Sequence, residues 1–207
     1  MITGSGFIHN VERLTRTSIL SSDSGLRRTL RRLKVADRGT TLRYRQRSDL
    51  PLFVKAQSVP KLLLDTTVYI DELQGKLPTE VARMLGAASL WHSTVTECEL
   101  SALAGLLNPN NPDTQHTIDQ VLASIGRRPD HRIVNPDREV WRDAGILAGL
   151  LARVQQYGKA EQRQALNDAL IFLSAEKVGL TVLTRNLSDF DLLMQLAPYG
   201  KVLFYDI

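Results

Sequence analysis

Four acidic side chains lie next to short apolar runs in the second part of the sequence. Asp65 directly follows a run of leucines, and Glu99 lies shortly after a second apolar run. Asp168 and Asp189 stand before and after a third. Each run can form a buried strand, and functional groups of open parallel sheets gather outside the carboxyl ends of the strands. We therefore expect these four residues, called the acidic quartet below, to converge at one edge of a sheet.

Such a cluster has a definite chemistry. Two carboxylates ~4 Å apart repel each other by roughly 4 kcal/mol at an effective dielectric constant near 20, so a cluster must take up protons or bind cations. Oxygen ligands without cysteine or paired histidine favour Mg²⁺ or Mn²⁺ over zinc. These ions can polarise a phosphate, activate a water molecule and neutralise a leaving oxygen. The acidic quartet therefore predicts metal-dependent hydrolysis of a phosphodiester.

Each member of the acidic quartet also has a simpler explanation. Asp65 could cap a turn or a helix, and Glu99 could be the capping-box partner of Thr96. Asp168 could be a solvated charge on an amphipathic helix, and Asp189 could cap the helix that follows it. No single position decides between these alternatives. The expected placement of all four at one sheet edge favours the functional explanation.

Neighbouring acids leave the register open at two of the four positions. From strand ends alone, Glu97 competes with Glu99, and Asp191 competes with Asp189. We expect Asp71 to lie on an exposed turn of the first helix after Asp65. Cys98, the single cysteine, is expected to be a small core residue.

The elements that must position these residues alternate between strands and helices. Strands are predicted at 61–64, 90–95, 132–134, 181–184 and 202–205, and helices at 68–74, 79–88, 96–107, 114–125, 138–157, 162–178 and 188–195. Strands alternating with helices favour a parallel sheet covered on both faces. We predict one α/β domain over residues 60–207.

Composition narrows the class of protein further. The chain has 207 residues, of which 43% are apolar and 23% charged, so it can bury one sizeable core. A single cysteine excludes an intrachain disulfide and a cysteine-rich zinc site. No apolar run approaches the roughly 20 residues of a membrane span, and the N-terminus has no signal-peptide pattern. We expect a cytoplasmic protein without a membrane partner.

Residues 1–59 form a basic N-terminal extension. Residues 1–60 hold 12 Lys and Arg against 4 Asp and Glu, whereas residues 61–207 hold 14 against 18. Leucines at spacings of four and three between arginines predict a short amphipathic helix at 24–34. The extension could be a solvated tail, could dock onto the acidic body or a dimer mate, or could guide RNA.

The residues around the acidic quartet resemble the motifs of PIN-domain proteins. The sequence LDTTVYID at 64–71 resembles their opening LDTNVLID, and STVTECEL at 93–100 their S-x-x-T-x-x-E-L. NDALI at 167–171 is similar to NDALIA, and TRNLSDF at 184–190 to TRNxxDF. The four motifs occur in the family's order over about residues 61–207. VapC-type toxins of bacterial toxin–antitoxin pairs are the most similar branch.

This resemblance implies a fold and an activity. The fold is a three-layer α/β/α sandwich with a five-stranded parallel sheet. The activity is that of an endoribonuclease dependent on Mg²⁺ or Mn²⁺, often as a homodimer, with an RNA substrate. A small antitoxin partner is implied, which blocks the site, often by inserting an arginine among the carboxylates.

The resemblance also assigns roles by position and settles the register. It selects Glu99 and Asp189, so the catalytic and metal-binding acids would be Asp65, Glu99, Asp168 and Asp189. Thr184 and Asn186 would be supporting hydrogen-bonding residues, with Thr66 near the first acid. Arg185 lies inside the last motif and could contact the substrate phosphate or balance local charge.

The sequence departs from the family pattern in two places. Thr67 stands where the family usually has Asn or Ser, a small polar change that we expect to be tolerated. Typical single-domain toxins lack the N-terminal extension, and this leaves other functions open. The alternatives are a housekeeping RNA-processing nuclease and a catalytically silent module that binds nucleic acid or protein. A phosphatase of the haloacid-dehalogenase type is not supported, because its second Asp would stand at Thr67. No phosphate-cradling GxxxxGK[ST] loop is present.

Overall fold

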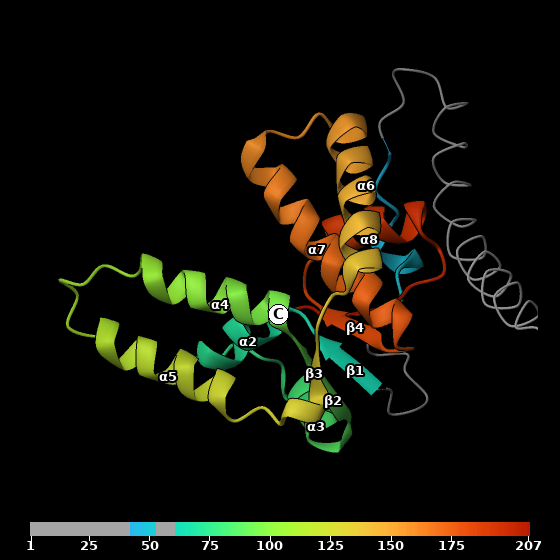
Figure 1. Ribbon diagram of the computed structural model, residues 1–207. Helices are drawn as coiled ribbons and strands as arrows, with labels where there is room; N and C mark the ends of the chain where they lie inside the picture. Colours follow the sequence, from blue (N-terminus) through green and yellow to red (C-terminus); the bar gives the residue numbers. More distant parts are fainter. Residues whose placement is uncertain (1–41, 53–60) are drawn as a thin grey trace, which may run out of the picture. The chain divides into compact units, whose positions relative to one another are not determined.

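Five short parallel strands form the sheet at the centre of the structure, a computed structural model that describes residues 42–52 and 61–207 (Figure 1). The strands are β1 (Lys61–Leu64), β2 (Ser89–Ser93), β3 (Ile133–Val134), β4 (Thr181–Thr184) and β5 (Lys201–Phe204). Their order in the sheet is β3-β2-β1-β4-β5, and every pair is parallel. All five lie within two residues of their predicted bounds.

The central strand β1 is apolar because both of its faces are covered. Leu62 and Leu63 are fully buried, and Leu64 nearly so. Successive side chains of a strand point to opposite faces. Leu62 and Leu64 therefore face one layer of helices, while Leu63 faces the other, as expected for a parallel sheet.

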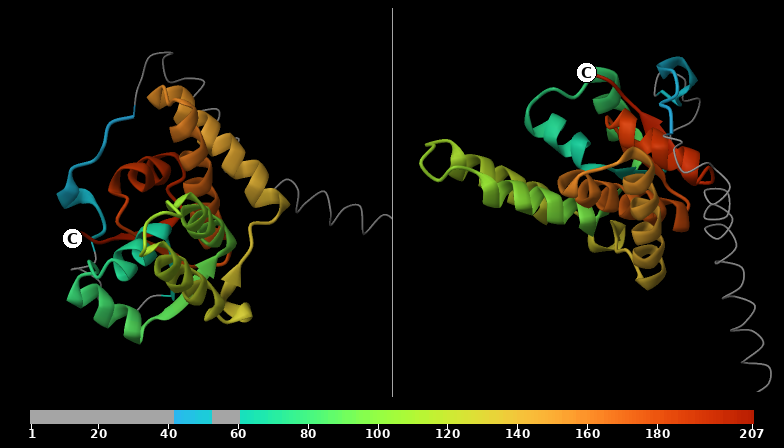
Figure 2. Two further views of the ribbon diagram at one scale, coloured as in Figure 1. Left: turned by 90° about the vertical axis from the view of Figure 1, so that its left-hand side faces the viewer. Right: turned by 90° about the horizontal axis from the view of Figure 1, so that it is seen from above.

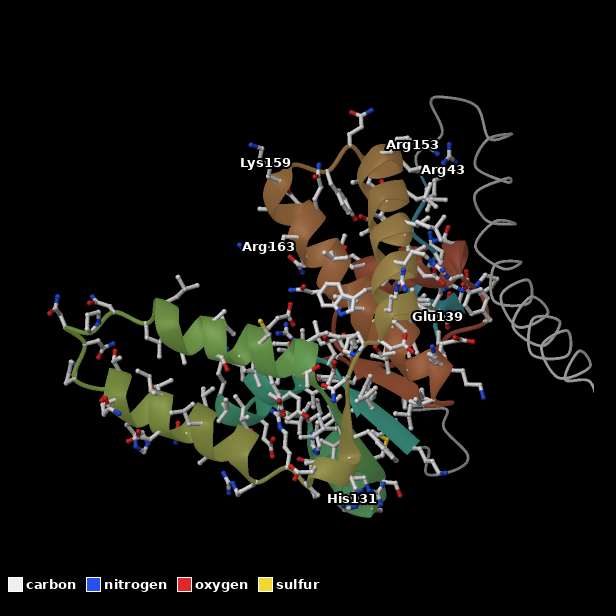
Figure 3. The ribbon with its side chains drawn as sticks, viewed as in Figure 1. Arg43, His131, Glu139, Arg153, Lys159 and Arg163 are labelled. Atoms are coloured by element: carbon white, nitrogen blue, oxygen red, sulfur yellow. The ribbon has the colours of Figure 1, made fainter. Side chains whose placement is uncertain are left out.

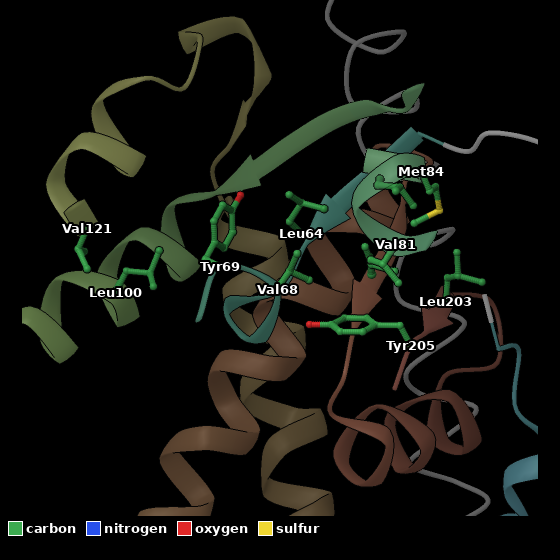
Figure 4. Packing of buried hydrophobic residues seen from close by; sticks show 11 residues of the cluster. Leu64, Val68, Tyr69, Val81, Met84, Leu100, Val121, Leu203 and Tyr205 are labelled. Atoms are coloured by element: carbon green, nitrogen blue, oxygen red, sulfur yellow. The ribbon is translucent and has the colours of Figure 1, made fainter. Parts of the chain in front are cut away.

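The helices are α2 (Thr66–Leu73), α3 (Thr79–Ala87), α4 (Thr94–Leu106), α5 (Thr114–Gly126), α6 (Arg138–Gln155), α7 (Lys159–Lys177) and α8 (Leu187–Leu196). On one face, side chains of α2 and α3 such as Val68 and Val81 pack with Leu64 of β1 and Leu203 of β5 (Figure 4). On the other face, α7 packs against β4 and β5 and also against α6 and α8. The predicted three-layer α/β/α sandwich is confirmed.

Helices α4 and α5 form a hairpin that projects away from the sheet (Figure 2). Its base joins the core through Leu100 and Val121. Farther out, Leu103, Leu106 and Leu122 are exposed. The hairpin therefore contributes to the domain mainly through the first turns of α4, where Glu99 lies.

The strand order places a switch point between β1 and β4. From β1 the chain moves to β2 and β3 on one side, and then crosses back to β4 on the other side of β1. Ligands of such sheets bind outside the carboxyl ends of the strands at this point. Asp65 follows β1 there, and Thr184 ends β4.

Residues 42–52, called the strap below, pack onto the same domain beside the edge strand β5. Leu50 is buried, and Leu52 forms a parallel bridge with Phe204 of β5. The amide of Phe204 donates to the carbonyl of Pro51 at 3.0 Å. Sequence reasoning placed these residues in the N-terminal extension.

The remainder of that extension lies outside the described residues. This includes the predicted helix at 24–34 and the predicted boundary at residue 59, which stay predictions. Within residues 42–52 and 61–207, no helix is long and apolar enough to cross a membrane.

Candidate functional site

Asp65 begins helix α2 at the carboxyl end of β1. Its backbone is extended and its carboxylate accepts a hydrogen bond from the amide of Thr67, so it is the N-cap that its type predicts. The same carboxylate oxygen accepts from the hydroxyls of Thr67 and Thr184, each at 2.7 Å. Burial raises the pKa of the Asp65 carboxyl, while these hydrogen bonds lower it. Capping and a site role therefore coexist in this residue.

Glu99 lies in the second turn of α4 and reaches back to two other elements. Its carboxylate accepts hydrogen bonds from the hydroxyl of Thr66 on α2 and, at 2.8 Å, from the side-chain amide of Asn167 on α7. Burial raises the pKa of Glu99, the two hydrogen bonds lower it, and the charge of Asp65 raises it further. The capping-box explanation of Glu99 is wrong.

The reason lies in the start of the helix. Helix α4 begins at Thr94, where the hydroxyl of Ser93 accepts from the amide of Val95 at 3.1 Å. Thr96 is already inside the helix and buried, with its hydroxyl 3.4 Å from the carbonyl oxygen of Leu64. Ser93 is therefore the N-cap, and Thr96 ties α4 to the end of β1.

Among the described residues, Asp168 has the fewest hydrogen-bond partners of the acidic quartet. It lies in the middle of α7 with only 5% of its surface exposed, so it is not the solvated charge considered as an alternative. Burial raises its pKa well above the usual range, and the charges of Asp65, Asp189 and Glu99 raise it further. The side-chain amide of Asn186 lies 3.4 Å from its carboxylate. A buried carboxylate with this single weak partner is suited to binding a cation.

Asp189 lies in the first turn of α8, whose N-cap is Asn186. The side-chain amide of Asn186 donates to the Asp189 carboxylate at 2.8 Å, and its oxygen accepts from the Asp189 amide at 3.3 Å. The hydroxyl of Tyr157 and the side-chain amide of Gln164 lie 3.4 and 3.5 Å from the same carboxylate. Asn186 thus contacts two members of the acidic quartet.

The structure therefore brings the four predicted acids to the carboxyl edge of the sheet, linked by shared neighbours and by their charges. Every hydrogen-bond partner of the acidic quartet named above is a neutral group. In the described part of the chain, no ion pair joins these four acids to Lys, Arg or His. The electrostatic cost of bringing them together is thus not offset by a cation of the domain.

This donor set fits Mg²⁺ or Mn²⁺ by its chemistry, since it offers carboxylate oxygens and hydroxyl or amide neighbours. Asp168, which is buried and has one long hydrogen bond, is also suited to binding such an ion. Within the residues that the structure describes, no three His, Cys, Asp or Glu side chains are already arranged to hold one metal ion. The carboxylates of Asp65, Glu99 and Asp189 accept hydrogen bonds from neighbouring hydroxyl and amide groups.

Of the predicted supporting residues, Thr184, Asn186 and Thr66 all contact an acid. Thr66 contacts Glu99, whereas the first acid, Asp65, receives its hydrogen bonds from Thr184 and Thr67. The backbone amide of Asn186 also donates to the Thr184 hydroxyl at 2.9 Å.

Arg185 turns to the other side of the same loop. Its guanidinium donates at 2.8 Å to Asp71, which is fully buried and also accepts from the Tyr205 hydroxyl at 2.7 Å. Of the two roles considered for Arg185, charge balance fits this pairing. The expectation that Asp71 is exposed is wrong, because α2 turns this residue inward toward the loop after β4.

The structure also decides the alternative at Asp191 and overturns the expectation for Cys98. Asp191, which competed with Asp189 on strand ends alone, is 1% exposed and paired with Arg45 of the strap. Cys98 is exposed instead of buried. Helix α4 buries the face that carries Val95 and Leu100, and this leaves Cys98 on the solvent side of the projecting hairpin.

Sequence reasoning missed four contacts of the site: Thr67, Asn167, Tyr157 and Gln164. Two of them stand inside the quoted motifs, directly after Asp-Thr and directly before Asp168, so their positions carried a signal. Tyr157 lies in the connection between α6 and α7 and Gln164 in the second turn of α7, where nothing in the sequence marked them. Thr67 also accepts a hydrogen bond from the amide of Arg185 at 3.1 Å, so threonine serves well at this position.

The fold is shared with chains of solved complexes. A chain of VapBC2 from Rickettsia felis, bound to a DNA fragment from their promoter, aligns with a TM-score of 0.50 and 16% identity, over 70% of this chain and 98% of that one. A chain of FitAcB from Neisseria gonorrhoeae aligns with a TM-score of 0.50 and 23% identity, over 70% and 96%. A chain of DNA-bound VapBC from Salmonella typhimurium aligns with a TM-score of 0.50 and 21% identity, over 70% of this chain and 98% of that one.

These likenesses show that the domain shares its fold with chains of the VapBC and FitAcB complexes, in agreement with the fold that the resemblance to PIN-domain proteins implied. No family model matches the sequence, and no curated protein matches it. At identities this low, the likeness establishes the fold.

Proposed function

We propose that this protein is a divalent-cation-dependent endoribonuclease that cleaves RNA phosphodiesters, and that it is the toxin of a toxin–antitoxin pair. The observation that carries the nuclease assignment is Asp168, a buried carboxylate beside three others and without a cationic partner among the described residues. Buried titratable groups with strongly shifted pKa values are concentrated at functional sites. The PIN fold and the four motifs around the acids support the same assignment.

In this proposal the acidic quartet holds Mg²⁺ or Mn²⁺, and the ion supplies an activated water and charge neutralisation at the phosphate. The chain's own residues position the ligands. Thr67 and Thr184 fix one oxygen of Asp65, while Thr66 and Asn167 fix the two oxygens of Glu99. Asn186 holds Asp189 and lies next to Asp168. Hydrogen bonds that orient ligands in this way commonly affect metal affinity.

The proposal extends to partners by the resemblance alone. A small antitoxin would neutralise the toxin by occupying the acidic quartet, and the toxin would act in the cytoplasm as a homodimer. Expression of the wild type should inhibit growth, and expression of Asp65→Ala should not. Growth inhibition that is equal in both would contradict the toxin assignment.

The direct test is RNA cleavage by purified protein with Mg²⁺ or Mn²⁺. Asp65→Ala and Asp168→Asn should lose more activity than the roughly 10–100-fold that substitutions of outer-shell partners cause. Asp119→Asn is the matched control, because Asp119 is an exposed acid of α5 whose partner is Gln115. It should retain full activity. Chelation with EDTA should abolish cleavage, and full activity of both site variants would refute the assignment.

Metal binding has a separate readout. Mn²⁺ should raise the melting temperature of the wild type and of Asp119→Asn, because a ligand that binds the folded state stabilises it. The shift should be much smaller in Asp168→Asn. An equal shift in all three proteins would place the ion elsewhere.

A further inference from the structure

Helix α7 crosses the acidic quartet and continues beyond it toward its own N-terminus. Gln164 contacts Asp189, Asn167 contacts Glu99, and Asp168 is buried among the acids. The surface of α7 between the acidic quartet and Lys159, the first residue of the helix, is therefore a path along which an extended ligand can lie.

Two exposed cations lie along that direction. Arg163 is four residues before Asn167, and Lys159 is four residues before Arg163, so the three side chains follow one line on the helix surface. Figure 3 shows Lys159 and Arg163 on the same side of α7. The line ends at Glu99, because Asn167 donates to it.

Three arginines of the domain are already engaged by other groups. Arg185 pairs with Asp71, Arg45 with Asp191, and Arg128 lies 93% buried over the ring of Tyr69. In residues 42–52 and 61–207, no ion pair joins Lys159 or Arg163 to an acid. These two side chains are therefore available to an anionic ligand.

We propose that Arg163 and Lys159 bind consecutive phosphates of single-stranded RNA and guide the strand to the acidic quartet. The inference rests on the proposed function and adds the path of the substrate to it. Four carboxylates at one sheet edge repel a polyanion, so a substrate needs cations close to that edge. Arginine suits the inner position, because its planar guanidinium can grip a phosphate through two hydrogen bonds.

The test measures RNA binding without cleavage. In the Asp168→Asn background, the Kd for a fluorescently labelled single-stranded RNA is measured by anisotropy at several salt concentrations. The slope of log K against log salt is negative, and each lost phosphate contact reduces its magnitude by about 0.7 for single strands. Combining Lys159→Gln with Arg163→Gln should therefore weaken binding and reduce the magnitude of the slope by about 1.4.

A matched pair of substitutions controls for net charge. Arg83→Gln with Lys201→Gln also removes one Arg and one Lys, both exposed. Lys201 begins β5, and Arg83 lies on α3 before β2, so both stand toward the amino ends of the strands, opposite the acidic quartet. This pair should leave the slope close to that of the parent. Arg163→Lys keeps a charge and should recover most of the slope lost in Arg163→Gln.

The outcomes separate this inference from the proposed function. If the parent binds RNA and the wild type cleaves it, but the two double variants have equal slopes, the phosphate-binding line is refuted and the nuclease assignment stands. If the parent binds no RNA and the wild type cleaves none, both are refuted. In cleavage assays of otherwise wild-type protein, the α7 variants should raise KM by a larger factor than they change kcat.

Discussion

Two pairs of buried acids in this domain have opposite electrostatic surroundings. Asp71 and Asp191 are 0% and 1% exposed, and each is neutralised by an arginine. Asp65 and Asp168 are 3% and 5% exposed, and their partners are hydroxyl and amide groups. Burial of a charge is unfavourable unless a counter-charge compensates for it. The first pair is neutralised within the fold, whereas the second has no cationic partner among the described residues.

The sharpest test of the first kind of acid is Arg45→Ala. It leaves Asp191 buried with Gln195 as the remaining side-chain partner, and loss of one partner of a buried pair costs about 3 kcal/mol. The free energy of unfolding from urea titration should fall by about that amount. Arg47→Ala is the control, because Arg47 pairs with the exposed Asp206 and such pairs contribute at most about 1 kcal/mol. Equal effects of the two substitutions would contradict the comparison.

Substitution of an acid without a cationic partner among the described residues should raise the free energy of unfolding instead of lowering it. Asp168→Asn removes a buried charge that lies near three like charges, so the metal-free protein should become more stable. We expect a gain of roughly 0.5–2 kcal/mol, the usual range for stabilising substitutions, in urea titrations with EDTA present. Asp191→Asn should instead lower stability. A loss of stability in Asp168→Asn would mean that this carboxylate supports the fold.

The smallest expected effect is in the pH dependence of stability. Asp65 and Asp168 have pKa values raised above the usual 3.8, so they bind protons more tightly in the folded state. Their contribution to stability is present below pH 3.8 and is lost as the pH rises through the raised values. The stability of metal-free wild type relative to Asp168→Asn should therefore decline over that window. A difference that is constant with pH would refute the raised values.

The contribution of His92 to stability depends on pH in the opposite sense. Because His92 is present in both wild type and Asp168→Asn, its contribution cancels when the two are compared. Burial lowers its pKa from 6.5 to about 4, so its contribution is present above pH 6.5 and is lost as the pH falls toward 4. Its hydrogen bond with the Tyr69 hydroxyl is common to both proteins. The difference between wild type and Asp168→Asn isolates the acidic quartet.

The strands and the acids could be predicted because their signals are local. The leucines of β1 and the apolar run of β4 identify buried strands by themselves, and a strand-end acid follows or precedes each of them. The family motifs then selected Glu99 over Glu97 and Asp189 over Asp191. These choices agree with the side chains that the structure places at the carboxyl edge.

Pairings between distant segments could not be predicted in the same way. Arg45 and Asp191 are separated by 146 positions, and Arg185 and Asp71 by 114. No periodicity connects such residues, so Asp71 and Asp191 looked like any other acid near the motifs. Helix starts were also uncertain, since Ser93 and Thr96 are both good capping residues and only packing against β1 decides between them.

The strap also affects association between separate copies of the chain. Strand β5 ends the sheet on its side, and an open strand edge readily adds a strand from another chain. The bridge between Leu52 and Phe204, with the hydrogen bond to Pro51, occupies part of that edge. A chain cut before β1 would expose the edge of β5 and become prone to aggregation, even with its acidic quartet intact.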